Sequence, residues 1–316
     1  MSNDIPLNAR DYIAPKYWGL WLVFGIMQLS TYLPMKWTQA IGSVIGRLGY
    51  RLVASRRRVA RINIRQAYPD YSEEKIRELN REHFRSLGIS FFEMGLAWWG
   101  KSDKLRAASH VEGMQHLEKA VARGKGVVLL SGHFTTLDIG GRLIGLHTVF
   151  DEKYKDYTLN GVYKKAHSPF FNAMMTHRRA YYGDELIENN NVRAVIRGLR
   201  KGAITWFAPD QDFAQQDIVF TPFLGGIAST LTATARMSEI TGAAVVPYYA
   251  ERLDNARGYR LVLLPELENF PTGDIQADSA RINKAIEEMA YANPSQYGWV
   301  HKRFKTQPPG SPPVYQ

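Results

Sequence analysis

The chain has 316 residues, enough for one large domain or two modest ones with a substantial apolar core. It contains no cysteine, which excludes disulfides and thiolate metal sites. Forty Lys and Arg residues against thirty Asp and Glu give a formal net charge of +10, which indicates an anionic partner. Nucleic acid, a phosphorylated substrate and an anionic membrane surface all fit this charge.

An uncharged stretch, "YWGLWLVFGIMQLSTYLPM", runs from Tyr17 to Met35. Nineteen helical residues are just enough to cross a hydrocarbon core of roughly 30 Å, and aromatic residues near both ends are typical of membrane interfaces. We therefore predict an N-terminal membrane-anchor helix. A hairpin, an interfacial helix and a buried core helix remain as alternatives, because glycine, proline and polar residues dilute the stretch.

Basic residues are concentrated after this stretch. Eight Lys and Arg residues lie between positions 36 and 65, whereas only Arg10 and Lys16 precede it. This asymmetry predicts that the rest of the chain is cytoplasmic. Residues 40–62 repeat apolar side chains at helical spacing with cations between them, which fits either a helix on an anionic leaflet or a solvated charged face.

The remainder alternates predicted strands and helices. Ser72 is placed to cap a helix over 72–99. The predicted strands are "GVVLLSG", "YTLNGVY", "AITWFAP", "AAVVPYYAE" and "YRLVLLPE", with helices near 137–146, 168–180, 190–200 and 229–241 and a late one in "SARINKAIEEMAYANP". This order predicts an α/β fold, a central mostly parallel sheet with helices on both faces. We expect a membrane-proximal region 1–69, a catalytic domain 70–305 and a Pro-rich tail 306–316.

The segment "SGHFTTLDIGG" (131–141) places His133 at the end of a predicted strand and Asp138 five residues later. Residues five apart in one helix point away from each other, so the two side chains can meet only if His133 precedes the helix. A ring held by Asp138 would keep one nitrogen free as a general base. The alternative is a capping box, in which Thr135 and Asp138 merely start the helix.

A second polar group follows another predicted strand. "WFAPDQDF" places Asp210 and Gln211 at its carboxyl end, the edge of an open α/β sheet where ligands bind. We therefore expect His133 and Asp210 to face one crevice, although an Asx-type turn after Pro209 is an alternative. No compact spacing of metal ligands appears, so we predict no metal site.

Two arginines, Arg178 and Arg179, lie beside bulky apolar residues in "HSPFFNAMMTHRRAYYG". This combination suits a phosphorylated amphiphile, because the guanidinium fork binds phosphate in a bidentate manner; a solvated basic helix end is the alternative. The sequence has no phosphate-binding P-loop, dinucleotide fingerprint or serine hydrolase elbow, and we predict no cofactor.

Taken together, these segments resemble the lipid A late acyltransferases, within the wider acyltransferases marked by H-x-x-x-x-D/E. The resemblance covers nearly the whole chain, and the lauroyl branch looks nearest. It rests on the uncharged stretch near 17–35 and on "GHFTTLDIGGR", "NGVYKKAHSPFFN", "APDQDF", "VFTPFLGG" and "QYGWVHKRFKTQP", in this order. Asp138 stands where many relatives have glutamate, and Lys164 stands near a position where arginine is usual.

The resemblance implies transfer of a fatty acyl group from acyl carrier protein to a hydroxyacyl chain of a Kdo-bearing lipid A precursor at the bacterial inner membrane. His133 would be the general base, and Asp138 would hold its ring. Arg179 would bind phosphate, Asp210 and Gln211 would shape the acceptor side, and Lys164 would supply a phosphate or sugar contact.

Three other interpretations remain. A membrane acyltransferase with another phospholipid or glycolipid acceptor would use the same residues. A nucleic-acid-binding protein would explain the charge but not the uncharged stretch, so we expect no nucleic-acid partner. A structural membrane protein would not explain polar residues gathered at strand ends.

Overall fold

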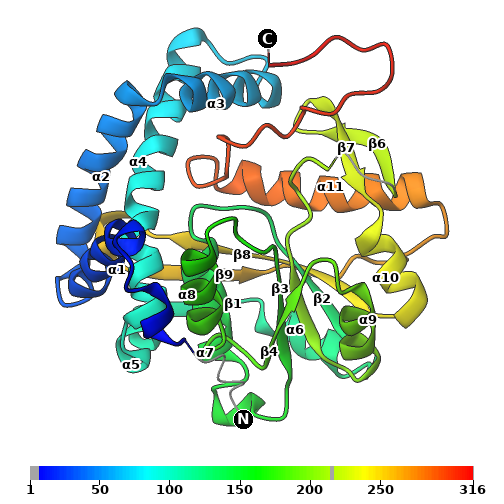
Figure 1. Ribbon diagram of the computed structural model, residues 1–316. Helices are drawn as coiled ribbons and strands as arrows, with labels where there is room; N and C mark the ends of the chain where they lie inside the picture. Colours follow the sequence, from blue (N-terminus) through cyan, green and yellow to red (C-terminus); the bar gives the residue numbers. More distant parts are fainter. Residues whose placement is uncertain (1–6, 214–216, 316) are drawn as a thin grey trace.

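A seven-stranded sheet forms the centre of the computed structural model, which describes residues 7–213 and 217–315 (Figure 1). Its strand order is β1-β9-β8-β2-β5-β3-β4, and all neighbouring strands are parallel except β8 and β9. The strands are β1 Ser109–Glu112, β2 Val127–Leu130, β3 Leu159–Tyr163, β4 Glu185–Glu188, β5 Ile204–Phe207, β8 Ala244–Arg252 and β9 Tyr259–Leu263. The predicted α/β class with a mostly parallel sheet is confirmed.

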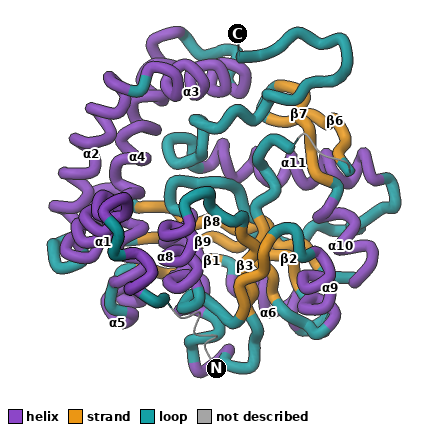
Figure 2. The backbone as a smooth tube through the Cα atoms, viewed as in Figure 1, coloured by secondary structure: helices purple, strands orange, loops and turns teal. Residues whose placement is uncertain are grey.

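Helices cover both faces of this sheet (Figure 2). Because successive strand residues point to opposite faces, Val127 and Leu129 of β2 enter one core cluster while Val128 and Leu130 enter the other. The first cluster includes residues of α6 Met114–Val121, α7 Leu137–His147 and α8 Pro169–Arg179; the second includes residues of α9 Val192–Arg200, α10 Ala233–Thr241 and α11 Ile275–Ala292.

The first five helices precede the sheet: α1 Trp18–Ser30, α2 Met35–Leu52, α3 Ala54–Ala67, α4 Glu73–Trp99 and α5 Ser102–Ala107. Ser72 caps α4 as predicted, since its hydroxyl accepts from the backbone N–H of Lys75. α2 packs closely on α4 through glycine, because a Cβ on Gly88 would overlap the Gly42 carbonyl oxygen. This contact leaves the opposite face of α2 outward.

The predicted membrane-spanning anchor is not supported. Residues 17–35 divide between the 13-residue α1, a turn and the start of α2 after Pro34. A helix of this length is about 20 Å long, too short for the hydrocarbon core. Within residues 7–213 and 217–315, no helix has the length and apolarity needed to cross a membrane. The inner face of α1 is also part of the main core, where Phe24 packs near Trp98.

Other differences lie at short or hairpin strands. The predicted helix 229–241 begins instead as β7 Gly226–Leu231, which pairs with β6 Ile218–Phe223, and α10 follows only from Ala233. The four-residue strands β1 and β4 were not predicted. Both lie at sheet edges and contain polar or charged residues that are not buried, so neither gives the continuous apolar run of a buried strand.

Candidate active site

His133 and Asp210 follow two adjacent parallel strands, β2 and β5, whose last residues Leu130 and Phe207 are in register. The Nδ1 atom of His133 lies 2.5 Å from Oδ1 of Asp210, and the His133 backbone N–H donates to Oδ2 at 2.8 Å. The two side chains therefore meet at one edge of the sheet. Because an ionised carboxylate can only accept, Nδ1 carries the proton and Nε2 is left as the basic ring nitrogen.

The carboxylate of Asp210 is buried, and it also accepts from the hydroxyl of Tyr297 at 2.9 Å. Burial alone would raise its pKa, but the charge and two hydrogen bonds of His133, together with Tyr297, lower the pKa to about 2. Asp210 is therefore ionised at neutral pH. The side chain of His133 is 27% exposed, so a substrate can reach the ring while the buried Asp210 holds it in position.

Asp138 has a different partner from the one predicted. In the first turn of α7, its two oxygens accept from Nε and Nη2 of Arg179, each at 2.9 Å, and Oδ1 also accepts from Tyr182. The predicted partner of His133 was therefore wrong: the ring of His133 is hydrogen-bonded to Asp210, and Asp138 is paired with Arg179. Asp138 lies in the first turn of α7, within reach of Arg179 at the end of α8. His133 is held instead near the end of β5, because its backbone N–H donates to Asp210.

Thr135 and Asp138 do not form the capping box that was the alternative interpretation of their spacing. α7 begins at Leu137 rather than after Thr135, and its N-cap Thr136 makes no side-chain capping bond. The Thr135 hydroxyl instead pairs with Ser86 on α4 at 2.7 Å.

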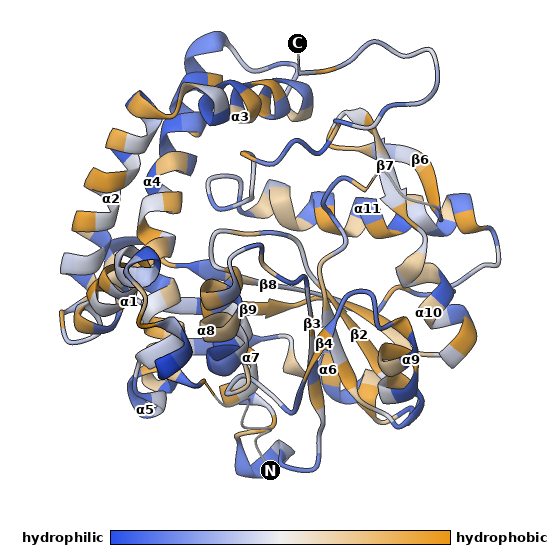
Figure 3. Ribbon diagram, in the orientation of Figure 1, coloured by the Kyte–Doolittle hydropathy of each residue, from blue (hydrophilic) through white to orange (hydrophobic). Residues whose placement is uncertain are grey.

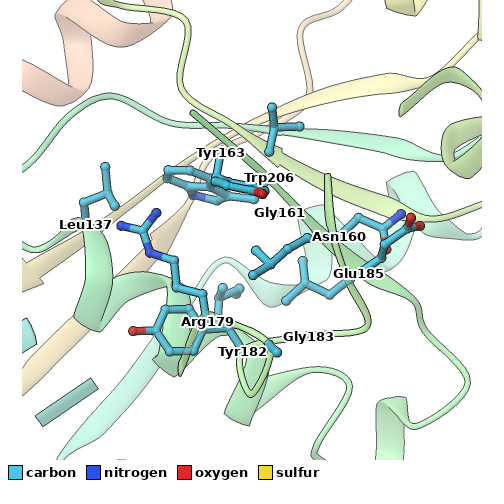
Figure 4. Close-up of a pocket in the computed structure, with 15 residues that line it drawn as sticks. Leu137, Asn160, Gly161, Tyr163, Arg179, Tyr182, Gly183, Glu185 and Trp206 are labelled. Atoms are coloured by element: carbon cyan, nitrogen blue, oxygen red, sulfur yellow. The ribbon is translucent and has the colours of Figure 1, made fainter. Parts of the chain in front are cut away.

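Arg179 is the last residue of α8, and its side chain is largely buried. Burial lowers its pKa, but the charge and hydrogen bonds of Asp138, together with Tyr182, outweigh burial and raise the pKa. Figure 4 shows the guanidinium close to Leu137 and to the rings of Tyr163 and Trp206, at one end of an apolar pocket. Two of its nitrogens bind Asp138, and phosphate binding by Arg179 stays a prediction.

His133 lines two cavities of substantial size. A cavity of about 420 Å³ extends from His133 to α9 and α10, and its wall includes Gln211 and the exposed Lys164. Its apolar lining includes Val162, Val195, Ile196, Phe207, Met237 and Ile240. A second cavity, of about 210 Å³, is lined by His133 and Asp138 together with residues of α4. His133 thus forms part of the wall of two cavities that are large enough for ligands.

The segment 296–301 supplies two site residues to which the sequence had assigned no role, Tyr297 and His301. The His301 ring centre lies 5.7 Å from that of His133, and burial lowers the pKa of His301 to about 4. The only signal for either residue was that "QYGWVHKRFKTQP" resembles a family segment. Among the described residues, no group of three or more His, Asp or Glu side chains is arranged to hold a metal ion.

A histidine fixed by a buried carboxylate at the carboxyl edge of a parallel sheet, beside two cavities, defines an α/β enzyme site for proton transfer. Residues 6–306 match the family described as bacterial lipid A biosynthesis acyltransferase. The chain belongs to this family, and it is an enzyme that transfers acyl groups.

Relatives from Escherichia coli (strain K12) match along almost the entire chain. A lipid A biosynthesis palmitoleoyltransferase is 33% identical over 97% of each chain. A lipid A biosynthesis lauroyltransferase is 30% identical over 99% of each chain. A lipid A biosynthesis myristoyltransferase is 24% identical over 100% of this chain and 95% of its own.

Proposed function

We propose that this enzyme transfers a fatty acyl group from acyl carrier protein to a hydroxyacyl chain of a Kdo-bearing lipid A precursor at the bacterial inner membrane. The observation that carries the proposal is the His133–Asp210 pair, placed beside two cavities in a chain of this family. Two cavities suit a reaction in which an acyl donor and a hydroxyl acceptor meet at one base.

In the proposed reaction, Nε2 of His133 removes the proton from the acceptor hydroxyl as that oxygen attacks the thioester carbonyl. The tetrahedral intermediate then collapses, the carbon–sulfur bond breaks, and the imidazolium returns the proton to the departing thiolate. Asp210 keeps the proton on Nδ1 and stabilises the imidazolium, the role predicted from sequence for Asp138. No metal or cofactor takes part.

Asp138 and Arg179 would act as a pair, in which Arg179 holds Asp138 in position at the wall of the second cavity. Gln211 and Lys164 line the larger cavity with His133, where they would contact polar groups of a substrate. Lys164 is exposed, so its ammonium is accessible to a substrate phosphate at the opening.

Membrane contact would be made by the outward faces of α1 and α2 rather than by a spanning helix. Their exposed large apolar residues follow helical spacing: Trp18, Leu22, Ile26 and Leu29 on α1, and Trp37, Ile41, Val44, Ile45, Leu48 and Leu52 on α2. Figure 3 shows hydrophobic residues recurring along α2. Such a surface suits a monotopic protein whose helices lie in the interface, with the catalytic site on the cytoplasmic side.

The acyl group is proposed to be lauroyl, following the branch that the sequence resembles. Two relatives at 33% and 30% identity are named for different acyl groups, so identity does not select the chain. Purified enzyme should therefore be given lauroyl, myristoyl and palmitoleoyl acyl carrier proteins in competition, with a Kdo-bearing lipid A precursor in detergent. Mass spectrometry should find predominantly a lauroyl-bearing product, and none with His133→Ala.

Each part of the proposal can fail separately in this assay. A palmitoleoyl product would overturn only the chain length. Transfer to lysophospholipid, but not to the lipid A precursor, would favour the alternative acceptor. A His133→Ala enzyme with unchanged turnover would remove His133 from the mechanism.

A further inference from the structure

The helix α9 carries four exposed basic residues, Arg193, Arg197, Arg200 and, directly after the helix, Lys201. Their spacing places them on one side of the helix, while Val195 and Leu199 on the other side are buried in the core. α9 contains no acidic residue, and among the described residues none of the four cations forms an ion pair. We call these four residues the α9 basic surface.

The basic residues of α3 are arranged differently. Arg61 and Arg65 pair with Glu73, and Arg56 donates to the backbone carbonyl of Val300. Interactions within the protein already use these cations in part. The four residues of the α9 basic surface are exposed and have no acidic partner within residues 7–213 and 217–315, so their charge is available to another molecule.

The α9 basic surface adjoins the opening of the larger cavity. Ile196 lies beside the residues of the α9 basic surface and also lines the larger cavity. Val192, at the start of α9, lines the larger cavity as well. The same cavity reaches His133. A ligand held against α9 could therefore extend an attached chain through the cavity to the basic nitrogen.

The position of α9 argues against a lipid surface as the partner. In Figure 1, α1 and α2 lie at the left edge of the molecule and α9 and α10 at the right. A membrane that contacts the apolar faces of α1 and α2 would leave α9 directed elsewhere. A soluble partner with an acidic surface fits both the charge and the location.

We propose that the α9 basic surface is the docking site of the acidic protein that carries the acyl thioester, and that the larger cavity admits the acyl-bearing arm. This inference rests on the proposed function, in which the donor is acyl carrier protein. Docking through charge raises the apparent affinity and the association rate, and it leaves the chemistry at His133 unchanged.

The test compares two donors with the full-length enzyme: lauroyl-acyl carrier protein and the small, neutral lauroyl thioester of N-acetylcysteamine. For the double variant Arg193→Glu/Arg197→Glu, KM for the carrier protein should rise about tenfold or more and kcat should change little. KM for the small thioester should stay within about twofold of wild type. Increasing salt should raise the wild-type KM for the carrier protein more steeply than that of the variant.

Two matched variants separate charge from structure. Arg193→Lys/Arg197→Lys keeps the charge and should retain a near wild-type KM. Arg77→Glu/Arg81→Glu reverses an exposed pair of the same spacing on α4 and should leave both donors unaffected.

Three results would overturn docking at α9: an unchanged KM for the carrier protein, an equal rise for both donors, or a loss confined to binding of anionic vesicles. A wild-type enzyme that uses neither donor would contradict the proposed function instead. A wild-type enzyme with no preference for the carrier protein would contradict the proposed donor.

Discussion

Replacing Asp210 by Asn tests which carboxylate supports the base. In the wild-type protein Oδ2 accepts two hydrogen bonds, from the His133 backbone N–H and from Tyr297, while Oδ1 accepts from Nδ1 of the ring. The single oxygen of Asn is expected to take the Oδ2 position, where two donors converge. Its NH2 group then faces Nδ1, which must accept. The proton moves to Nε2, and the ring presents the wrong nitrogen to the acceptor hydroxyl.

The loss also includes the charge that stabilises the imidazolium. At an effective dielectric constant of about 20, two unit charges about 4 Å apart attract by about 4 kcal/mol. Since 1.36 kcal/mol is a factor of ten in rate, this corresponds to about 10³-fold in kcat. The tautomer change acts in the same direction, so we expect a fall in kcat of about 10²–10⁴-fold. KM should change little, because the buried carboxylate does not face the cavities' openings.

The assay measures kcat with saturating acyl-acyl carrier protein and precursor in detergent, alongside the melting temperature of each variant. Asp210→Asn should be much slower than Asp138→Asn. If Asp210→Asn keeps kcat within about threefold of wild type, while Asp138→Asn loses as much as His133→Ala, the assignment is refuted and Asp138 regains the role predicted from sequence.

Acid stability gives an independent measure of the same pair. The pKa of Asp210 is lowered in the folded protein to about 2 from an ordinary value of 3.8. Its ionised form therefore contributes stability that is present above about pH 4 and is lost as the pH falls towards 2. Between these values, wild type should lose more unfolding free energy than Asp210→Asn, as denaturant titrations at each pH can measure. Equal losses would contradict this contribution.

The remaining predictions use the same assays. His133→Ala should abolish transfer while the protein still folds, with a lower melting temperature because the buried Asp210 loses the ring that binds it; residual turnover above about 10% of wild type would contradict its role as base. Asp138→Asn should destabilise the protein by roughly 1–3 kcal/mol, since it weakens a largely buried pair with Arg179, and unchanged urea unfolding would refute this pairing. Leu22→Ser/Leu29→Ser should preserve folding, because both side chains are exposed, but lower binding to lipid vesicles at least about tenfold; equal sedimentation with vesicles would exclude α1 from the membrane surface.

The sheet could be predicted from sequence because its central strands are buried on both faces and read as continuous apolar runs. The meeting of His133 and Asp210 followed from the same pattern, since both residues come directly after such runs and parallel strands end at one edge. The hairpin of β6 and β7 had no comparable signal. Its residues mix polar Thr and Ser with apolar side chains, and the sequence pattern assigns its last residues, 229–231, to a helix.

The partner of Asp138 could not be predicted from local spacing. Five residues separate it from His133, but the angle between the two depends on where the helix starts, and α7 starts one residue after Thr136 because Thr135 bonds to α4 instead. Arg179 lies more than forty residues away and reaches Asp138 only because α8 ends beside α7. Asp210 is farther still, yet its contact with His133 was easier to anticipate, since it depends on strand order alone. Long-range contacts between strand ends are thus more accessible to sequence reasoning than short-range contacts whose geometry depends on where a helix begins.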